Sequence, residues 1–199
     1  LLTGPTGCGK STTLYSFLKE INDPTVNIVT VEDPVEFTMQ GINQTQVNTK
    51  ANMTFSAALR SILRQDPDVI MIGEIRDKET AEIAVRSAIT GHIVFSTLHT
   101  NDAPGAILRL EDMGVEDYLV ADALVGVIAQ RLVKRLCPAC KKKGRTNARE
   151  MEILGITEPI SIARPQGCQF CNHTGYKGRI AVHELMYMNE AMKHAVLTE

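Results

Sequence analysis

The stretch that decides the fold is GPTGCGKS, Gly4 to Ser11, which fits the pattern G-x-x-x-x-G-K-[ST] at every required position. Glycines in such a loop let backbone N–H groups turn towards phosphate oxygens, and the helix that follows adds the positive end of its dipole. Lys10 can reach the β- and γ-phosphates of a nucleotide, and Ser11 can ligate Mg²⁺. The stretch therefore predicts a phosphate-binding loop between a buried strand, ending at Leu1 to Thr3, and a helix.

The candidate nucleotide-binding residues are this loop and the first turn of the helix after it. They are Gly4, Pro5, Thr6, Gly7, Cys8, Gly9, Lys10, Ser11 and Thr12. A strand before the loop and a helix after it argue against a chance match in a Gly-rich turn. The sequence lacks an N-K-x-D guanine-reading signature, which favours ATP over GTP.

Apolar periodicity outside the loop predicts helices that alternate with strands. The predicted helices span residues 10–21, 55–64, 79–89, 103–113, 118–136, 148–154 and 190–197. The predicted strands span residues 1–3, 26–31, 42–47, 69–72 and 93–97. Because these strands are apolar on both faces, they predict a mainly parallel sheet covered by helices, an α/β fold.

Composition limits the classes of protein that fit. With 199 residues the chain can bury one sizeable core and a small appendage. Its net charge of −2 gives no global sign of a nucleic-acid partner. No stretch approaches the roughly 18 uncharged apolar residues of a membrane-spanning helix. The predicted division is 1–136 for the nucleotide-binding core, 137–178 for a cysteine-rich subdomain and 179–199 for a C-terminal helical segment.

Two acidic segments follow predicted strands. Asp68 to Glu74, DVIMIGE, places Glu74 after an apolar strand, where a carboxylate can hold the Mg²⁺ shell or orient an attacking water. Val29 to Phe37, VTVEDPVEF, places Glu32 and its acidic neighbours at the carboxyl end of another strand. Ligands of open α/β sheets bind at that edge, although Asp-Pro also forms turns. Glu74 and Glu32 both remain candidates for the residue that activates water.

The segment TGHIVFSTLHT, Thr90 to Thr100, places His92 and His99 on either side of a predicted strand. A single histidine is more often structural than functional. His99, however, follows the strand, at the same edge as the phosphate-binding loop, where it can sense a phosphate.

Four of the five cysteines form two C-x-x-C pairs, Cys137 with Cys140 and Cys168 with Cys171. Two such pairs can supply a tetrahedral thiolate site for Zn²⁺. The 27 residues between the pairs exceed usual zinc-ribbon spacing, so a small helical insert must fit there. Redox chemistry at one pair is the alternative. His173 and His183 lie near the cysteines in the sequence but are surplus as ligands.

A basic cluster surrounds the first cysteine pair and consists of Lys134, Arg135, Lys141, Lys142, Lys143 and Arg145. Such a cluster can bind anionic lipid or nucleic acid, or only solvate a metal site. The few aromatic residues nearby disfavour a surface that stacks single-stranded bases.

Together the segments GPTGCGKSTTLY, VTVEDPVEF, RQDPDVIMIGEIRD, TGHIVFSTLHTNDA and CNHTGYKGRIAVHEL resemble the bacterial secretion ATPase family of type II secretion and type IV pilus assembly. The resemblance covers the whole chain, with four motifs in order. It implies a RecA-like P-loop core, in which Gly4 to Ser11 match the Walker A motif and Gly73-Glu74 match the Walker B. Glu32 falls in the aspartate box. Cys8 departs from the family, where serine is more usual.

The resemblance also implies functional properties. His92 and His99 match the family's histidine box, and the four paired cysteines match its tetracysteine zinc site. The implied protein is a homo-hexameric, Mg²⁺-dependent ATPase in the cytoplasm, peripheral to the inner membrane, which acts on an inner-membrane platform protein and not on nucleic acid. Glu74, Glu32 and His99 are the candidate catalytic residues, with Ser11 and Glu74 at Mg²⁺. The cysteines favour motors that extend pili or pseudopili.

Two alternatives remain from the sequence: a retraction motor of the same family, and a P-loop nucleic-acid translocase with a zinc module. The family also has a domain before the phosphate-binding loop that contributes arginines to the nucleotide. We expect that domain to precede Leu1 in a longer protein, and we expect the 199 residues alone to bind ATP but to hydrolyse it slowly.

Overall fold

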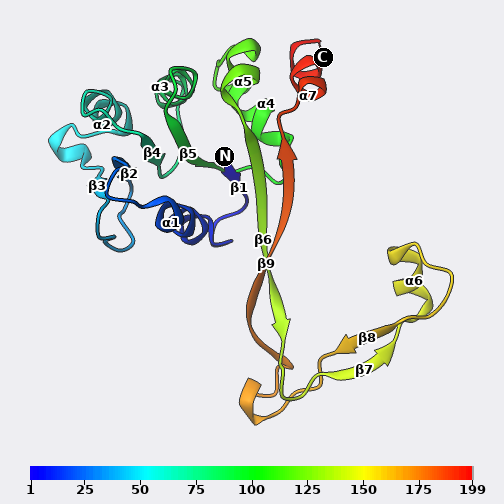
Figure 1. The fold of residues 1–199 in the computed structure, drawn as a ribbon. Coiled ribbons are helices and arrows are strands. Elements are labelled where there is room, and N and C mark those ends of the chain that lie inside the picture. The colour runs from blue at the N-terminus through cyan, green and yellow to red at the C-terminus, as the bar shows by residue number, and fades with distance from the viewer. Residues whose placement is uncertain (199) are drawn as a thin grey trace. The chain divides into compact units, whose positions relative to one another are not determined.

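The computed structural model describes residues 1–198, and the chain divides into two compact units. The first unit combines residues 1–131 with residues from 183 onwards, and the second comprises residues 132–182 (Figure 1). The first unit carries the phosphate-binding loop and the second carries the paired cysteines. Each unit is described separately below.

A sheet with the strand order β3-β2-β4-β5-β1-β6-β9 organises the first unit. Its strands are β1 (Leu2–Thr3), β2 (Ile28–Glu32), β3 (Asn43–Gln46), β4 (Val69–Ile72), β5 (Ile93–Leu98), β6 (Gly126–Leu136) and β9 (Tyr176–Tyr187). Strands β1 to β6 pair in parallel, and β9 runs antiparallel to β6 (Figure 1). This arrangement confirms the predicted α/β fold with a mainly parallel sheet.

Helices cover the sheet and enclose two apolar clusters. They are α1 (Lys10–Ile21), α2 (Phe55–Ile62), α3 (Lys78–Ile89), α4 (Gly105–Asp112), α5 (Asp117–Ala123) and α7 (Glu190–Thr198). Strand β4 shows how the core is built. Ile70 and Ile72 pack with residues of α2 and α3, whereas Val69 and Met71 pack with residues of α1. Because side chains alternate across a strand, one apolar run supplies both faces of the sheet.

The predicted bounds of α1 and β4 agree with the structure, but the helix predicted over residues 118–136 is wrong. There the structure has the short helix α5 followed by strand β6. Residues 125–128, Val-Gly-Val-Ile, favour a strand, because β-branched side chains fit a pleated surface and glycine weakens a helix interior. Pairing with β1, Leu2 opposite Ile128, makes β6 the neighbour of the strand that leads into the phosphate-binding loop.

Strand β9 was also missed, although its second half completes the first unit. The N–H of Met188 donates to the carbonyl of Val125 at 3.0 Å, beside the start of β6. Helix α7 follows, and its residues Met192 and Val196 pack on the apolar cluster. Residues 183–198 therefore belong to the compact unit that holds the nucleotide-binding motifs.

The second unit contains an antiparallel pair of strands, β7 (Lys142–Arg145) and β8 (Ser161–Arg164). Helix α6 (Ala148–Leu154) lies between these strands in the sequence and has the predicted bounds, whereas the two strands were not predicted. Asn147 begins the helix in a capping box: its side chain accepts from the N–H of Glu150, and the Glu150 carboxylate accepts from the N–H of Asn147. Arg164 of β8 forms an ion pair with Glu150 and so joins the helix to the strand pair.

Candidate functional site: a phosphate-binding loop and a polar edge of the sheet

The phosphate-binding loop joins the end of β1 to the start of α1. Gly4 has φ +143°, and a Cβ placed on it would lie 2.3 Å from the carbonyl oxygen of Gln130, so no other residue fits there without displacing β6. Lys10 is largely buried, and its Nζ donates to the carbonyl of Gly4 at 2.7 Å. Its ammonium therefore lies against the loop, in position for a phosphate that the loop amides would bind.

Ser11 and Thr12 lie in the first turn of α1 with exposed side chains. The Ser11 hydroxyl and a nearby carboxylate are oxygen donors of the kind that Mg²⁺ prefers. Gly9 begins the helix in a left-handed conformation without a side-chain cap. The first N–H groups of α1 thus remain for a phosphate, as at other anion-binding helix starts.

Glu74 lies just after β4 and has a partner for each carboxylate oxygen. His99 Nε2 lies 3.0 Å from its Oε1, and Arg76 Nε donates to its Oε2 at 2.7 Å. Arg76 also forms an ion pair with Asp33 at 3.5 Å. The ends of β2, β4 and β5 therefore contribute one connected row of charged side chains at the carboxyl edge of the sheet.

Hydrogen bonds made by β5 and by the segment directly after it hold the backbone next to Glu74 and next to His99. The hydroxyl of Thr97 donates to the carbonyl of Gly73 at 2.7 Å, directly before Glu74. On the other side of β5, the buried hydroxyl of Thr3 accepts from the N–H of Thr100 at 2.8 Å. The strand that ends in the phosphate-binding loop is thereby joined to the segment that holds His99.

Glu32 differs sharply from Glu74. Its side chain is buried, and its Oε1 accepts from the hydroxyl of Thr30 at 2.5 Å and from Nε2 of Gln44 at 3.1 Å. Its Oε2 accepts from the hydroxyl of Tyr15 in α1. Burial, and then this hydrogen bond, raise the pKa of Tyr15 to about 12. Glu32 is thus enclosed by hydrogen-bond donors, whereas Glu74 is the partly exposed carboxylate of the pair.

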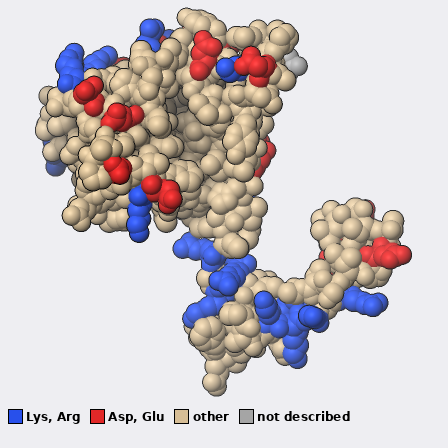
Figure 2. Space-filling view, in the orientation of Figure 1, with Lys and Arg blue, Asp and Glu red and all other residues tan. Residues whose placement is uncertain are grey.

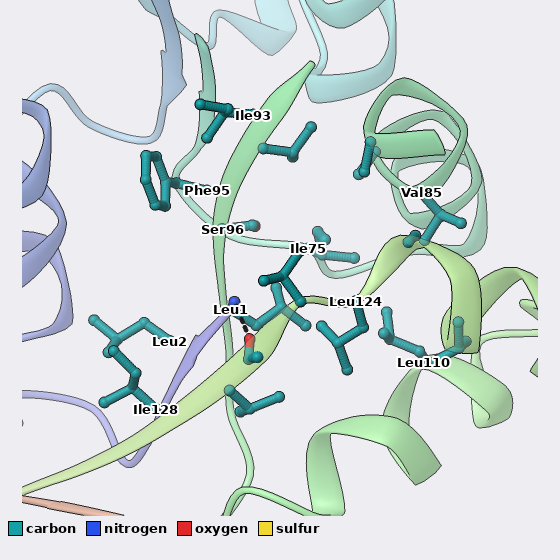
Figure 3. A pocket seen from close by; sticks show the side chains of 18 of the residues that line it. Leu1, Leu2, Ile75, Val85, Ile93, Phe95, Ser96, Leu110, Leu124 and Ile128 are labelled. Atoms are coloured by element: carbon teal, nitrogen blue, oxygen red, sulfur yellow. Dashed lines mark hydrogen bonds between the residues drawn. The ribbon is translucent and has the colours of Figure 1, made fainter. Parts of the chain in front are cut away.

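His92 and His99 lie at opposite ends of β5. His92 precedes the strand, and its Nδ1 lies 3.0 Å from the carbonyl of Ser87 in α3. The amino ends of β1, β5 and β6 instead surround a cavity of about 510 Å³ with an apolar lining that includes Leu2, Phe95 and Ile128 (Figure 3). An apolar lining at this edge does not suit a triphosphate, so the polar site lies at the carboxyl edge.

Sequence reasoning missed Gln130, because β6 was predicted as a helix. Its buried side-chain amide donates to the carbonyl of Cys8 inside the phosphate-binding loop at 2.7 Å. A buried glutamine directly after an apolar run is the signal that could have identified it, since a buried amide needs hydrogen-bond partners.

The four paired cysteines of the second unit form one cluster, with all four Sγ atoms within 4.8 Å of one another. The separation is 4.0 Å between Cys137 and Cys168, 3.8 Å between Cys140 and Cys171, and 3.8 Å between Cys168 and Cys171. A tetrahedron with Zn–S bonds of about 2.3 Å places its sulfurs about 3.8 Å apart. The cluster therefore fits a single Zn²⁺ ion.

Backbone groups around the cluster favour thiolates. The N–H groups of Cys168 and Gly175 each donate to Sγ of Cys171 at 3.2 Å, and that of Gly167 donates to Sγ of Cys140 at 3.3 Å. Burial raises the pKa of Cys171, but the N–H groups of Cys168 and Gly175, together with the thiols of Cys168 and Cys140, outweigh it and lower that pKa to about 6, whereas burial raises the pKa of Cys140 to about 11. Within residues 132–182, the buried apolar side chains are those of Cys137 and Cys171 alone. The cysteine cluster is thus the core of this unit.

Basic and acidic residues are distributed unevenly between the two units. Residues 132–182 hold ten Lys and Arg and three Glu, whereas the whole chain has a net charge of −2. Figure 2 shows Lys and Arg gathered on the surface of the second unit, with most of the visible Asp and Glu on the first. The near-neutral total therefore conceals a basic unit, and it does not by itself argue against an anionic partner for that unit.

The fold and the loop define the class: a RecA-like P-loop protein with an added tetracysteine subdomain. The chain belongs to the family described as type II/IV secretion system protein, whose model matches residues 1–199. This assignment supports the resemblance inferred from the sequence motifs. None of the helices described within residues 1–198 is long and apolar enough to span a bilayer.

Individual relatives are similar over nearly the whole chain. The type II secretion system ATPase E of Vibrio cholerae is 53% identical over 201 residues, covering all of this chain and 40% of that protein. The type IV pilus assembly ATPase PilB of Thermus thermophilus is 52% identical, covering 99% of this chain and 23% of that protein. The solved pilus retraction motor PilT with bound ADP has a TM-score of 0.71 and 33% identity, covering 98% of this chain and 48% of that one. The chain spans about 40% of the length of the type II secretion relatives.

Proposed function

We propose that this chain is the ATP-hydrolysing part of a hexameric motor that powers assembly of type IV pili or type II secretion pseudopili. The observation that carries the proposal is the arrangement at one sheet edge. The phosphate-binding loop follows β1, and Glu74, held by His99 and Arg76, follows the nearby strand β4. Family membership supports the same activity.

In the proposed reaction, Lys10 and the loop amides bind the phosphates, and Ser11 and Glu74 hold Mg²⁺. Bound there, Mg²⁺ would supply positive charge that offsets the negative charge of the phosphates. Glu74 orients the attacking water, and His99 fixes the carboxylate and responds to the γ-phosphate. Glu74 is preferred over Glu32 because the oxygens of Glu32 are enclosed by Tyr15, Thr30 and Gln44.

Glu74→Gln tests this assignment. We expect the variant to lose ATP turnover in the assembled hexamer while retaining Mg-ATP affinity, measured by phosphate release and by isothermal titration calorimetry. Glu82→Gln is the matched control, because Glu82 forms an exposed pair with Lys78 on α3. Full activity of Glu74→Gln in the hexamer would overturn the role of Glu74.

An assembly motor is favoured over a retraction motor. Relatives named for type II secretion or pilus assembly are 52–55% identical, against 33% for the retraction motor PilT. The cysteine cluster supports the same choice. In the proposal the hexamer works at the cytoplasmic face of the inner membrane, where its partners are a platform protein and other secretion or pilus components. The choice is tested by expressing the protein in cells that lack the assembly motor, where it should restore surface pili or secretion. Rescue only of cells that lack the retraction motor would contradict an assembly role.

The basic second unit favours one other candidate function, translocation along nucleic acid. Ten basic residues in 132–182 could neutralise phosphates, and such binding weakens steeply as salt rises. A titration with labelled DNA at two salt concentrations distinguishes the two functions. Tight, salt-dependent binding that stimulates ATP turnover would favour a translocase, and its absence would favour the secretion motor.

A further inference from the structure

The side chain of Gln130 joins the phosphate-binding loop to three other elements. Only 2% of the residue is exposed. Its Nε2 donates to the carbonyl of Cys8 at 2.7 Å, and its Oε1 accepts from the hydroxyl of Thr13 in α1 at 2.8 Å. His183 Nε2 on β9 lies 3.0 Å from the same Oε1. With donors at Oε1 and an acceptor at Nε2, only one orientation of the amide satisfies all three partners.

The backbone of Gln130 contacts the other end of the loop. A Cβ placed on Gly4 would lie 2.3 Å from the carbonyl oxygen of Gln130. The backbone of Gly4 therefore packs directly on β6. The loop is therefore held against the same residue at two points, at Gly4 by close packing and at Cys8 by a hydrogen bond. The Sγ of Cys8 is enclosed beside Gly4, and Cys8 is 4% exposed.

The residues next to Gln130 and His183 hold the segment after β5. Arg131 Nη2 donates to the carbonyl of Asn101 at 3.0 Å, and Glu184 Oε2 accepts from the N–H of Ala103 at 3.1 Å. The strands β6 and β9 thus contact both polar segments of the site, the phosphate-binding loop and the segment that follows His99.

The geometry points to Gln130 as a positioning residue for the phosphate-binding loop, an inference that rests on the proposed binding of nucleotide there. In a trans peptide the C=O and the next N–H point in opposite directions. Because the Gln130 amide holds the carbonyl of Cys8 towards β6, it directs the N–H of Gly9 away from β6. One side chain on a neighbouring strand thereby fixes a loop amide before any phosphate arrives, which lowers the ordering cost of binding.

His183 and Thr13 act one step further away, through Gln130. They donate to Oε1 and so keep Nε2 directed at Cys8. Without these donors the amide could rotate, and the bond to the loop would be lost for part of the time. Loss of the donor on Gln130 should therefore loosen the loop at Cys8 more than loss of His183 does.

The rate of alkylation of Cys8 tests the inference, because the thiol must leave its enclosed position to react. Nucleotide-free chain is treated with iodoacetamide, and the peptide that contains Cys8 is quantified by mass spectrometry. Gln130→Glu keeps the size and the acceptors but loses the donor to Cys8, and Gln130→Met loses all three bonds. We expect Cys8 to react about fivefold to tenfold faster in both, as for loss of one buried hydrogen bond.

Asn27→Leu is the matched control. Its side-chain amide also donates to backbone carbonyls, of Gln65 at 2.8 Å and of Asp66 at 3.0 Å, but at the opposite edge of the sheet. We expect its melting temperature to fall without faster alkylation of Cys8. His183→Leu replaces an exposed side chain and leaves Gln130 in place, so it tests the inference even if the Gln130 variants fail to fold; we expect alkylation about twofold to threefold faster.

The same assay separates the inference from the proposed function. Wild-type rates for Cys8 in folded Gln130 variants, or in His183→Leu if those do not fold, would overturn the positioning role. Equal acceleration in Asn27→Leu would overturn it too, since general destabilisation would then explain the change. Protection of Cys8 by Mg-ATP in the wild type tests nucleotide binding alone. Absence of that protection would count against the proposed function and leave the alkylation series to decide the role of Gln130.

Discussion

His99 Nε2 lies 3.0 Å from Glu74 Oε1 and joins the ends of two neighbouring parallel strands, β5 and β4. The carboxylate is 19% exposed and the imidazole 43%, so the contact lies at a surface that a ligand can reach. The imidazole N–H can fix the carboxylate in one orientation. This contact leads to the first of five predictions.

His99→Ala should lower kcat for ATP at least about tenfold while KM changes less than about threefold, because the orientation of Glu74 and the response to the γ-phosphate act on the hydrolysis step more than on nucleotide binding. His92→Ala is the control. It removes the other histidine beside β5, which contacts the carbonyl of Ser87 at the opposite end of the strand. Steady-state phosphate release gives both parameters. Equal losses in the two variants would contradict a specific role for His99.

Arg76→Ala should reduce turnover with little effect on stability. Arg76 contacts both Glu74 and Asp33, but more than half of its side chain is exposed, so its ion pairs contribute at most about 1 kcal/mol to folding. Arg60→Ala removes a similarly exposed pair, with Glu79 at 2.6 Å, away from this row. Urea unfolding and phosphate release are measured on both variants. The prediction is wrong if Arg76→Ala keeps wild-type turnover.

Glu32→Gln should lower the free energy of unfolding by about 1–3 kcal/mol, because one amide cannot accept all three hydrogen bonds that the carboxylate accepts. Glu74→Gln should change it by less than about 1 kcal/mol. Urea denaturation compares the two. A larger loss for Glu74→Gln would reverse the structural assignment of these glutamates.

The pKa of Tyr15 gives this same network a pH dependence. Its folded-state value of about 12 lies above the ordinary value near 10. The stabilisation is therefore fully present below about pH 10, declines as the unfolded chain ionises, and is lost as the pH rises through about 12. Tyr15→Phe should remove the tyrosinate absorbance change near pH 12 in the folded protein, measured by ultraviolet titration. An unchanged titration curve would contradict the raised pKa.

Metal removal should unfold the second unit and leave the first folded. The cysteines supply the buried apolar side chains of residues 132–182, so the unit has little else to keep it ordered. Reduced wild-type protein should contain about one zinc per chain by mass spectrometry of metals, and Cys168→Ser should lose most of it. Hydrogen exchange should then rise in 132–182 and stay unchanged in β4 and β5.

Cys8→Ser is the control for this experiment, because Cys8 is the one cysteine outside the cluster. It should keep the full zinc content. Substoichiometric zinc in reduced, chelator-free wild type would count against a zinc site, as would an intact second unit after the metal has been removed.

Several local features of the chain could be predicted from its sequence. The bounds of α1, β4 and α6 follow from apolar spacing and from nearby residues such as Asn147, all within a few positions. The loop from Gly4 to Ser11 is likewise a local pattern, because its glycines, Lys10 and hydroxyl must occupy fixed offsets to surround a phosphate. The clustering of the four cysteines followed from the chemistry of paired C-x-x-C motifs, and the structure confirms it.

The sequence by itself thus determined the loop, most of the alternation of strands and helices, and the set of four clustered cysteines. Only the tertiary structure decided that β6 extends over Gly126–Leu136 beside β1, that Glu32 is enclosed while Glu74 is partly exposed, and that Gln130 holds Cys8. The reason is separation along the chain: Gln130 lies 122 residues from Cys8, and β6 becomes a strand by pairing with β1. The propensities of neighbouring residues do not reveal contacts between distant residues, because the free energy that favours these contacts arises only when the sheet forms.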